Sequence, residues 1–318
     1  MAPRALIGDI GGTNARFALV EHPGRFSRPR VLPTHAHASL AAAISAYLAD
    51  EQLSAPPPQA VLAVASPITG DDVVLTNHPW SLSIGSLRQQ LGVEKLRVIN
   101  DFVACALAIP HLGERDRVQI GGGVAVDGAP IGIIGPGTGL GVSALMRINS
   151  EVVPLESEGG HVTLAAETAR EATILGAMRR RFDHVSAERI LSGPGLVNLY
   201  NVLCELSGAP AGPLTAAQIT SQITGPTIGN EERQRQEAKA LFCAMLGSTA
   251  GNLALTLGAR GGVYIAGGIA PRIIDDLRKS EFRRRFEAKG RLCTYLAAIP
   301  TYVIVHAWPA LLGASHLV

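Results

Sequence analysis

An aspartate, two glycines and a threonine near the amino terminus could together hold a phosphorylated ligand. Asp9, Gly11, Gly12 and Thr13 follow the apolar run 5–7 and precede a second apolar stretch. Glycine permits positive φ and lets backbone N–H groups surround an anion, while a hydroxyl and a carboxylate suit phosphate and Mg²⁺. The pattern predicts a phosphate-binding turn between two strands. A β-hairpin whose glycines serve only the turn is the structural alternative.

A second glycine-rich segment repeats this arrangement. Gly135–Gly141 contains Thr138 and lies between the apolar runs 131–134 and 142–146. A third pair, Gly267 and Gly268, follows the apolar run 263–266. Strand, glycine turn with threonine, and strand thus occur twice, which suggests an internal duplication in which each half supplies a phosphate loop. Chance occurrence of two hairpins is the alternative.

Asp101 is the carboxylate best placed by the sequence to act as a base. The short run 97–100 is typical of a strand, and 102–109 is typical of a helix that ends at Pro110. Ligands of α/β sheets bind beyond the carboxyl ends of the strands, where this side chain would lie. Capping the helix is the alternative role, because aspartate is favoured at that position.

The surrounding segments predict an α/β protein of two domains. We expect a helix over 40–48, a proline-rich loop over 54–58, a buried strand over 60–65 and a long helix over 231–257, in which Gly247 and Gly251 would admit another backbone. Pro271 should open a helix that ends at 279, and the last strand and helix, 302–306 and 309–314, should return to the first domain. The predicted domains are residues 1–110 plus 300–318, the smaller, and 111–299, the larger.

Composition excludes several classes of function. The 318-residue chain has a formal net charge of +2, so it lacks the basic field of a nucleic-acid-binding protein. The clusters Arg179–Arg181 and Arg283–Arg285 are expected on solvated helix faces. The four cysteines have no metal-site spacing and are expected to be reduced core residues. No signal peptide or membrane-spanning run is apparent, which predicts a soluble cytoplasmic protein.

Three common nucleotide-binding motifs are absent from the sequence. The segment Gly135–Gly141 has Leu140 where a dinucleotide-binding motif needs its third glycine. None of the four lysines follows a glycine in the P-loop frame, and the lysine and catalytic-loop motifs of protein kinases are missing. A phosphate site built from backbone turns of two domains remains.

Several ordered motifs resemble those of one kinase family. Asp9–Asn14 resembles the phosphate-1 motif of the sugar kinase, Hsp70 and actin superfamily, Gly135–Gly141 its phosphate-2 motif, and Gly262–Gly268 its adenosine motif. Further segments resemble bacterial ATP-dependent glucokinases of the non-ROK type over nearly the whole chain: Val98–Phe102, Glu158–Val162, His184–Arg189 and Leu191–Asn198.

The resemblance implies a fold, a reaction and a set of site residues. It implies two actin-like (ribonuclease H-like) α/β domains with an interdomain cleft, and phosphoryl transfer from ATP to the 6-hydroxyl of D-glucose, the first step of glucose use in glycolysis. Asp101 would be the general base. The sugar would be held by Asn100, Asp101, Glu158, His161 and Glu188. ATP would contact Gly8, Asp9, Ile10, Gly11, Gly12, Thr13, Gly137, Thr138, Gly267 and Gly268, with Asp9 holding Mg²⁺ through water.

Some alternatives remain open at this point. Glu156 rivals Glu158, a structural role is open to His161, and Glu188 could be a partner of a helix dipole. The family suggests a homodimer without the structural zinc of ROK kinases. The chain ends soon after Gly313, so the family's closing helix is expected to be shortened. A kinase for another hexose, or an ATPase that serves assembly or chaperoning, would share the phosphate loops.

Overall fold

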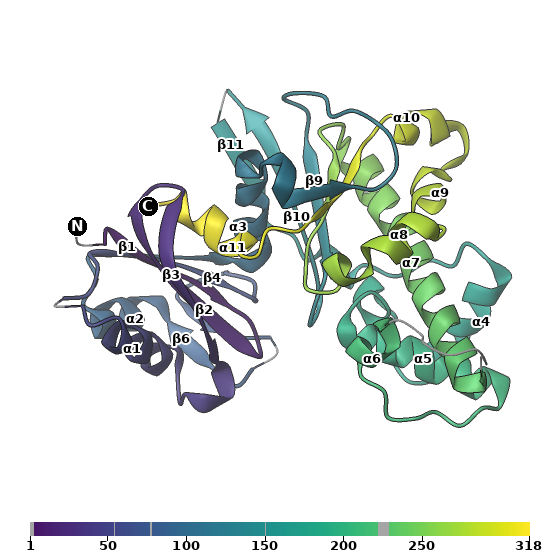
Figure 1. Ribbon diagram of the computed structural model, residues 1–318, viewed down its shortest axis with the longest axis horizontal. Helices are drawn as coiled ribbons and strands as arrows, with labels where there is room; N and C mark the ends of the chain where they lie inside the picture. Colours follow the sequence, from purple (N-terminus) through teal and green to yellow (C-terminus); the bar gives the residue numbers. More distant parts are fainter. Residues whose placement is uncertain (1–2, 54, 77, 150, 222–228) are drawn as a thin grey trace. The chain divides into compact units, whose positions relative to one another are not determined.

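A computed structural model describes residues 3–53, 55–76, 78–149, 151–221 and 229–318 (Figure 1). It divides into two compact units, which are described separately. Unit 1 contains residues 1–116, 152–156 and 306–318, and unit 2 contains residues 117–151 and 157–305. The domain limits at 110/111 and 299/300 stay a prediction. The first residue of the predicted loop over 54–58 lies outside the described residues.

Unit 1 is built on a mixed sheet in the order β3-β2-β1-β4-β7. Its strands are β1 (Ala5–Ile10), β2 (Asn14–His22), β3 (Arg25–Pro33), β4 (Gln59–Val64) and β7 (Lys95–Asn100). β1 pairs with β2 in antiparallel register, and β4 runs parallel to both β1 and β7. The predicted strand, glycine turn and strand at the start of the chain is therefore confirmed.

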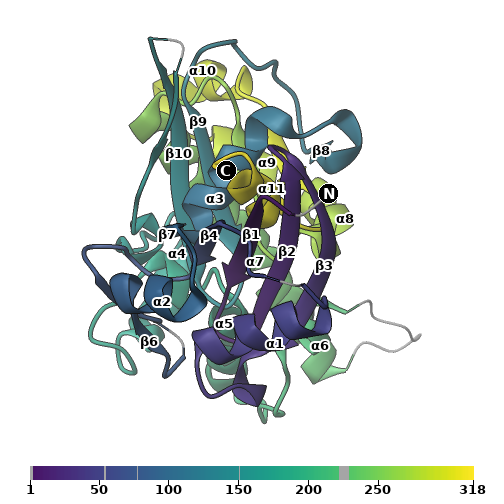
Figure 2. The ribbon, with the colours of Figure 1, turned by 90° about the vertical axis from the view of Figure 1, so that its left-hand side faces the viewer.

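Alternate residues of this sheet enter two separate apolar cores, as the two-residue period of a strand requires. Leu6 and Phe17 lie in the core that includes Tyr47 of α1 (Leu40–Asp50) and Leu87 of α2 (Ile84–Leu91). A short hairpin, β5 (Asp72–Val74) and β6 (Ser81–Ser83), also belongs to unit 1. Figure 2 shows α1 and α2 beside this sheet.

The opposite face of the sheet is covered by the end of the chain. Ile7 and Val20 pack with Leu311 of α11 (Pro309–Ser315), as expected for a C-terminal helix that returns to the first domain. α11 also lies against α3 (Asp101–Ala108), as Figures 1 and 2 show. A Cβ atom at Gly313 would overlap the carbonyl oxygen of Ala104, so glycine is what allows the two helices to approach.

Unit 2 contains a second sheet, in which strands follow the order β10-β9-β12-β13-β8. These strands are β8 (Arg117–Gln119), β9 (Ile131–Pro136), β10 (Leu140–Ile148), β12 (Val263–Ile265) and β13 (Thr301–Ile304); β11 (Glu151–Leu155) begins in unit 2 and continues into the part of the chain grouped with unit 1. β9 and β10 are antiparallel, which confirms the second strand, glycine turn and strand. β12 runs parallel to β9 and β13.

Helices complete unit 2 around the long α7 (Asn230–Leu257). The others are α4 (Ala169–Met178), α5 (Gly193–Ser207), α6 (Ala216–Thr220), α8 (Ile274–Lys279), α9 (Phe282–Glu287) and α10 (Cys293–Ala297). Gly247 and Gly251 of α7 lie against backbone carbonyls of Phe282 and Phe286, which confirms their predicted role in close packing. α7 is long and apolar enough to cross a membrane, but 61% of its apolar window is buried inside the protein, as in the core helix of a soluble protein.

Three expectations about local structure are wrong. Pro271 lies in a 3₁₀ turn (Ala270–Ile273) that precedes α8, and does not open the α-helix itself. Arg285 is only 4% exposed, because its guanidinium pairs with Glu171 of α4 through contacts of 2.7 and 3.1 Å. Cys293 is exposed, whereas the other three cysteines are buried as predicted.

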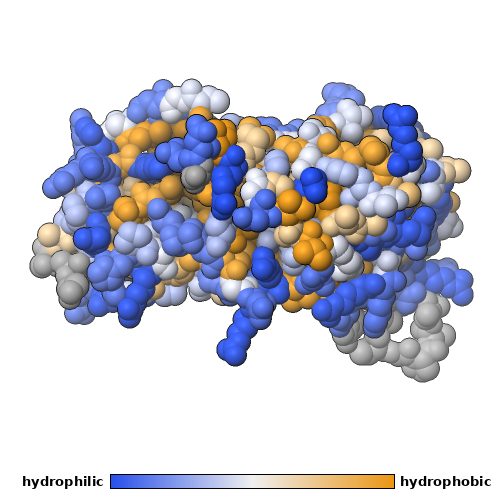
Figure 3. Space-filling view, turned by 90° about the horizontal axis from the view of Figure 1, so that it is seen from above, coloured by the Kyte–Doolittle hydropathy of each residue, from blue (hydrophilic) through white to orange (hydrophobic). Residues whose placement is uncertain are grey.

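The surface carries apolar as well as polar side chains. Figure 3 shows orange apolar residues reaching one face of the molecule among blue hydrophilic ones. Among the residues that the structure describes, the most exposed large apolar one is Val124, at 81%. Folded proteins ordinarily expose much apolar area, so these side chains need no special function.

Candidate active site

The predicted nucleotide turn and the predicted base lie at one edge of the sheet in unit 1. Ile10 pairs with Val64 in the register of β1 and β4, and Val64 pairs with Asn100 in the register of β4 and β7. Neighbouring strands are spaced by about 4.8 Å, so the ends of β1 and β7 are separated by roughly 10 Å. All three strands are parallel, and their carboxyl ends form the edge where ligands of α/β sheets bind.

The first glycine turn is held mainly through its carbonyl groups. Gly11 N donates to Asn14 O at 3.0 Å and closes the turn. Thr34 Oγ1 donates to Gly12 O, and Thr34 N donates to Thr13 O, both at 3.0 Å. These bonds fix the orientation of the turn after β1, which is what a backbone phosphate cradle requires.

Asp9 faces its cross-strand neighbour Arg16. The two residues are register partners in β1 and β2, and Arg16 Nη1 lies 3.0 Å from Asp9 Oδ2. Burial raises the pKa of the Asp9 carboxyl, and the charge and hydrogen bond of the guanidinium oppose that shift. Sequence reasoning assigned Arg16 no role, although strand pairing across a tight turn could have placed it opposite Asp9.

The donor set around Asp9 suits a weakly held Mg²⁺ better than a metal held by protein ligands alone. Among the described residues, no group of three or more histidine, cysteine, aspartate or glutamate side chains could hold a metal ion. Magnesium usually keeps several waters and binds one or two carboxylates together with substrate phosphates. A single, partly buried carboxylate beside a phosphate turn fits that pattern.

Asn100, and not Asp101, caps α3. Asn100 Oδ1 accepts hydrogen bonds from the N–H groups of Phe102 and Val103 at 2.8 and 3.2 Å, while Asn100 Nδ2 donates to Ser66 O at 3.3 Å. Asp101 is the first residue of α3, and its Oδ1 also accepts from Phe102 N at 2.9 Å. The expected strand-to-helix junction is confirmed, with the capping role shifted by one residue.

Asp9 and Asp101 also act on the same buried thiol. Burial raises the pKa of Cys105 well above its usual value, and the carboxylates of Asp9 and Asp101 raise it further. Cys105 lies one helical turn beyond Asp101 on α3, and both acidic residues singled out in the sequence belong to unit 1.

In unit 2, the second glycine turn is attached to the segment that carries Glu188. Glu188 Oε2 accepts a hydrogen bond from Leu140 N at 2.8 Å, at the end of the turn. Gly193 N donates to Gly137 O at 2.8 Å, at its beginning. Glu188 thus has a backbone partner in the second glycine turn, and it also lies in the first turn of a 3₁₀ helix, where a role as helix-dipole partner stays a prediction.

Glu158 and His161 lie together on a 3₁₀ turn after β11. His161 Nε2 is 3.9 Å from Glu158 Oε2, and both side chains are about half exposed, at 52% and 54%. Gly160 between them is buried against Leu140, where a Cβ would overlap the carbonyl oxygen. Glu156, the rival of Glu158, is grouped with unit 1, whereas Glu158 and His161 both belong to unit 2.

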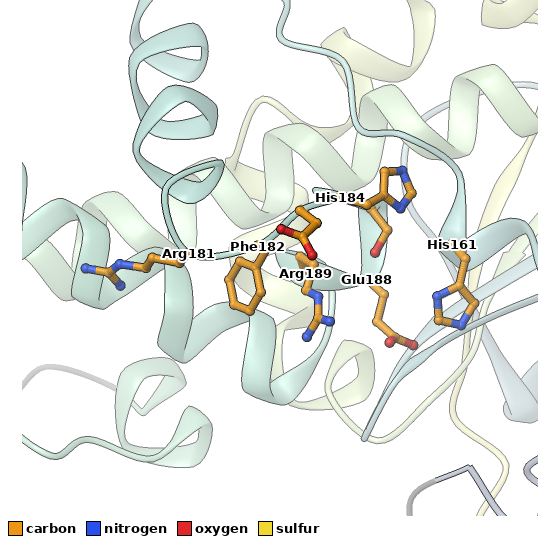
Figure 4. Close-up of a pocket in the computed structure, with 8 residues that line it drawn as sticks. His161, Arg181, Phe182, His184, Glu188 and Arg189 are labelled. Carbon is orange, nitrogen blue, oxygen red and sulfur yellow. The ribbon is translucent and has the colours of Figure 1, made fainter.

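His161 and Glu188 line one cavity of about 390 Å³ within unit 2. In Figure 4 the Glu188 side chain extends toward the side on which His161 lies, while Arg181 points away from both. The Arg189 guanidinium lies over the Phe182 ring, 4.4 Å from its centroid. The cavity has the volume of a small-molecule site, and its other lining residues, which the sequence did not predict as site residues, are Arg181, Phe182, Asp183, His184, Ser186 and Arg189.

The third glycine pair adjoins the second turn. Gly267 has φ of +82°, and a Cβ atom there would overlap the carbonyl oxygen of Pro136 at the end of β9. The position of a Cβ at Gly268 has no described atom within 4 Å. The predicted adenosine segment therefore follows β12 directly beside the strand that leads into Gly137 and Thr138.

Comparisons with known proteins agree with this arrangement. The Glucokinase family model matches residues 6–318. A glucokinase from Aromatoleum aromaticum is 53% identical over 311 residues, which cover 98% of this chain and 93% of that protein. The crystal structure of a glucokinase from an Antarctic psychrotroph matches with a TM-score of 0.83 at 38% sequence identity. The match covers 98% of this chain and 98% of that chain.

A more distant structure extends the fold similarity. A ROK family glucokinase from Streptomyces griseus, solved in complex with glucose and AMPPNP, has a TM-score of 0.65 at 19% identity, with 98% of each chain covered. Together with the two sheets described above, these similarities confirm the predicted α/β class of actin-like, ribonuclease H-like type. Sequence identity over the full length also confirms the predicted enzyme class. The chain belongs to the glucokinase family.

Proposed function

We propose that this enzyme transfers the γ-phosphoryl group of ATP to the 6-hydroxyl of D-glucose, with Asp101 as general base. The observation that carries the proposal is the register from Ile10 through Val64 to Asn100, which brings the first glycine turn and Asp101 to one sheet edge. Phosphoryl transfer depends on positioning and on neutralising charge, so a rigid sheet edge is a suitable platform.

The reaction follows from the groups at this edge. Asp101 accepts the proton of the 6-hydroxyl, the oxygen forms a bond to the γ-phosphorus, and the bond to the β-phosphate oxygen breaks to release ADP. Gly11, Gly12 and Thr13 would contact phosphate through the turn that Thr34 fixes. Mg²⁺, when bound, would neutralise phosphate charge, with Asp9 as its ligand through water.

The sugar would be held by the polar side chains that the sequence predicts for it. Asn100 Oδ1 already accepts two backbone hydrogen bonds, so its contribution to the sugar is a donor hydrogen on Nδ2. Glu158, His161 and Glu188 would bind further hydroxyls, and a wrong epimer would leave such groups unpaired. The cavity shared by His161 and Glu188 supports this role and favours a sugar kinase over an ATPase with no small substrate.

The nucleotide would lie along the remaining glycine segments. Gly8 and Ile10 belong to β1, which leads into the first turn, and Gly137 and Thr138 form the second turn. Gly267 and Gly268 would let the adenosine approach the backbone. The complex of the Streptomyces griseus glucokinase with glucose and AMPPNP supports this choice of ligands.

A coupled ADP-release assay with a panel of hexoses tests the reaction and its sugar. Glucose should give turnover that requires Mg²⁺, and sugar-independent ATP hydrolysis alone would refute the proposal. Asp101→Asn should lower kcat by about 10²–10⁴-fold with nucleotide binding retained. Asparagine keeps an oxygen for Phe102 N, so α3 should be undisturbed. Asp50→Asn, at an exposed carboxylate of α1, is the matched control and should leave kcat unchanged.

We also propose the cellular setting that the family suggests. A homodimer in the cytoplasm would use ATP and glucose as soluble substrates and would begin glycolysis. Light scattering on the purified protein should give twice the 33.2 kDa mass of one chain. A monomer over the micromolar range would contradict the dimer.

A further inference from the structure

Glu188 touches the second glycine turn as well as the proposed sugar cavity. Its Oε2 accepts the hydrogen bond of Leu140 N at 2.8 Å, and its side chain lines the cavity with His161. A hydrogen bond to a carboxylate is among the stronger ones in proteins. One carboxylate is therefore shared between a backbone loop and a ligand cavity.

The turn is fitted closely to this carboxylate. A Cβ atom at Gly139 would overlap Glu188 Oε2. The backbone of Gly139 is not in the left-handed region, so a larger residue there would have to displace the end of the Glu188 side chain. Gly137 N donates to Gly139 O at 2.8 Å, which links the start of the turn to the residue that touches Glu188.

The segment behind Glu188 is itself firmly held. Ser192 Oγ donates to Glu188 O at 2.8 Å and accepts from Gly195 N at 3.0 Å, as the cap of α5. Gly193 N donates to Gly137 O, so the same segment holds both ends of the turn. A displacement of the Glu188 side chain would release only one of these two attachments.

We propose that Glu188 is a positioning residue for the nucleotide, holding the phosphate turn through Leu140 N, in addition to its role as a sugar ligand. The inference rests on the proposed function, which places ATP phosphates at Gly137 and Thr138. Oε2 accepts the hydrogen bond of Leu140 N, and Oε1 binds a sugar hydroxyl. Occupancy of the sugar site then orders the same carboxylate that orders the turn, so sugar and nucleotide bind with positive coupling.

Nucleotide affinity in the absence of any sugar separates the two roles. Titration calorimetry with AMPPNP and Mg²⁺ gives the Kd of wild type, Glu188→Ala, Glu188→Gln and Gly139→Ala. Loss of a hydrogen bond to a charged group should weaken AMPPNP binding about 10-fold in Glu188→Ala. Glutamine keeps an acceptor for Leu140 N, so Glu188→Gln should stay within about 3-fold of wild type.

The other variants test the geometry. Gly139→Ala should weaken AMPPNP binding as Glu188→Ala does, because its methyl group displaces the carboxylate, and it carries the test if Glu188→Ala does not fold. His161→Ala, in the same cavity, should leave the sugar-free Kd unchanged. Circular dichroism checks the fold of each variant.

The outcomes also separate this inference from the proposed function. If Glu188→Ala binds AMPPNP as tightly as the wild type does, Glu188 is a sugar ligand only and the inference is overturned. Equal weakening of AMPPNP binding in Glu188→Gln and Glu188→Ala would overturn it as well. Hexose turnover by the wild type tests the proposed function separately and does not depend on these Kd values. A wild type that binds no AMPPNP would overturn both.

Discussion

The contact between α11 and α3 predicts an unusual effect of a single methyl group. Gly313→Ala adds a Cβ that would overlap Ala104 O and lie 3.0 Å from Ala108 N. These are backbone atoms of α3 and cannot rotate away. The overpacking should cost about 3 kcal/mol, the upper end of its usual range. Alanine in place of glycine inside a helix returns about 1 kcal/mol.

The expected net loss of unfolding free energy is about 2 kcal/mol, or roughly 30-fold in the unfolding equilibrium. The assay is urea denaturation followed by tryptophan fluorescence, because both tryptophans, Trp80 and Trp308, belong to unit 1. Gly85→Ala in α2 is the matched control. Its Cβ would be at an ordinary distance of 3.4 Å from Asp71 Oδ1, so it should not destabilise unit 1.

Equal stability of the Gly313→Ala and Gly85→Ala proteins would refute the reasoning. It would mean that α11 does not press against the backbone of α3 in solution. If only Gly313→Ala loses unfolding free energy and its kcat is also reduced, α11 supports the helix on which Asp101 lies.

Three other predictions concern an ion pair, a pair of stacked histidines and the cysteines. Glu171→Gln should lower the unfolding free energy by about 3 kcal/mol in urea denaturation, because it leaves the buried Arg285 incompletely paired. Burial lowers the pKa of His111 and His316, which stack with ring centroids 3.4 Å apart. The folded protein binds protons at these histidines less readily than the unfolded chain does. Their contribution to the free energy of unfolding is therefore complete above pH 6.5 and is lost as pH falls through that value toward the folded pKa values. Urea denaturation at a series of pH values should show a shallower decline of the unfolding free energy for the His316→Asn protein. Finally, a thiol reagent should label Cys293 rapidly and the three buried cysteines slowly, and Cys293→Ser should abolish the rapid phase.

Local patterns predicted the elements and glycine turns well. Asp9, Gly11, Gly12 and Thr13 lie in the turn between β1 and β2 because apolar runs on both sides leave few alternatives. The sequence also placed Asp101 at the end of a strand. It could not decide which neighbour caps α3, because asparagine and aspartate cap helices about equally well and the choice turns on one residue of register.

Long-range pairing was the part that local patterns could not provide. Arg285 reads as one of three solvated arginines, and its buried partner Glu171 lies 114 positions away in the chain. The bond from Leu140 N to Glu188 spans 48 positions and likewise leaves no local signal. Such contacts depend on how helices and turns pack, which composition and periodicity do not encode.

The composition of unit 1 from both ends of the chain has a consequence for its synthesis. Ile7, Val20 and Val61 are made early, but their covering residues Leu311 and Ala314 come from α11. At about 5–20 residues per second, roughly 10–40 s separate residue 116 from residue 306 on the ribosome. One apolar face of the first sheet therefore lacks its covering helix while unit 2 is translated. A nascent chain stalled before α11 should depend on chaperones, and it should lose that dependence once α11 is supplied.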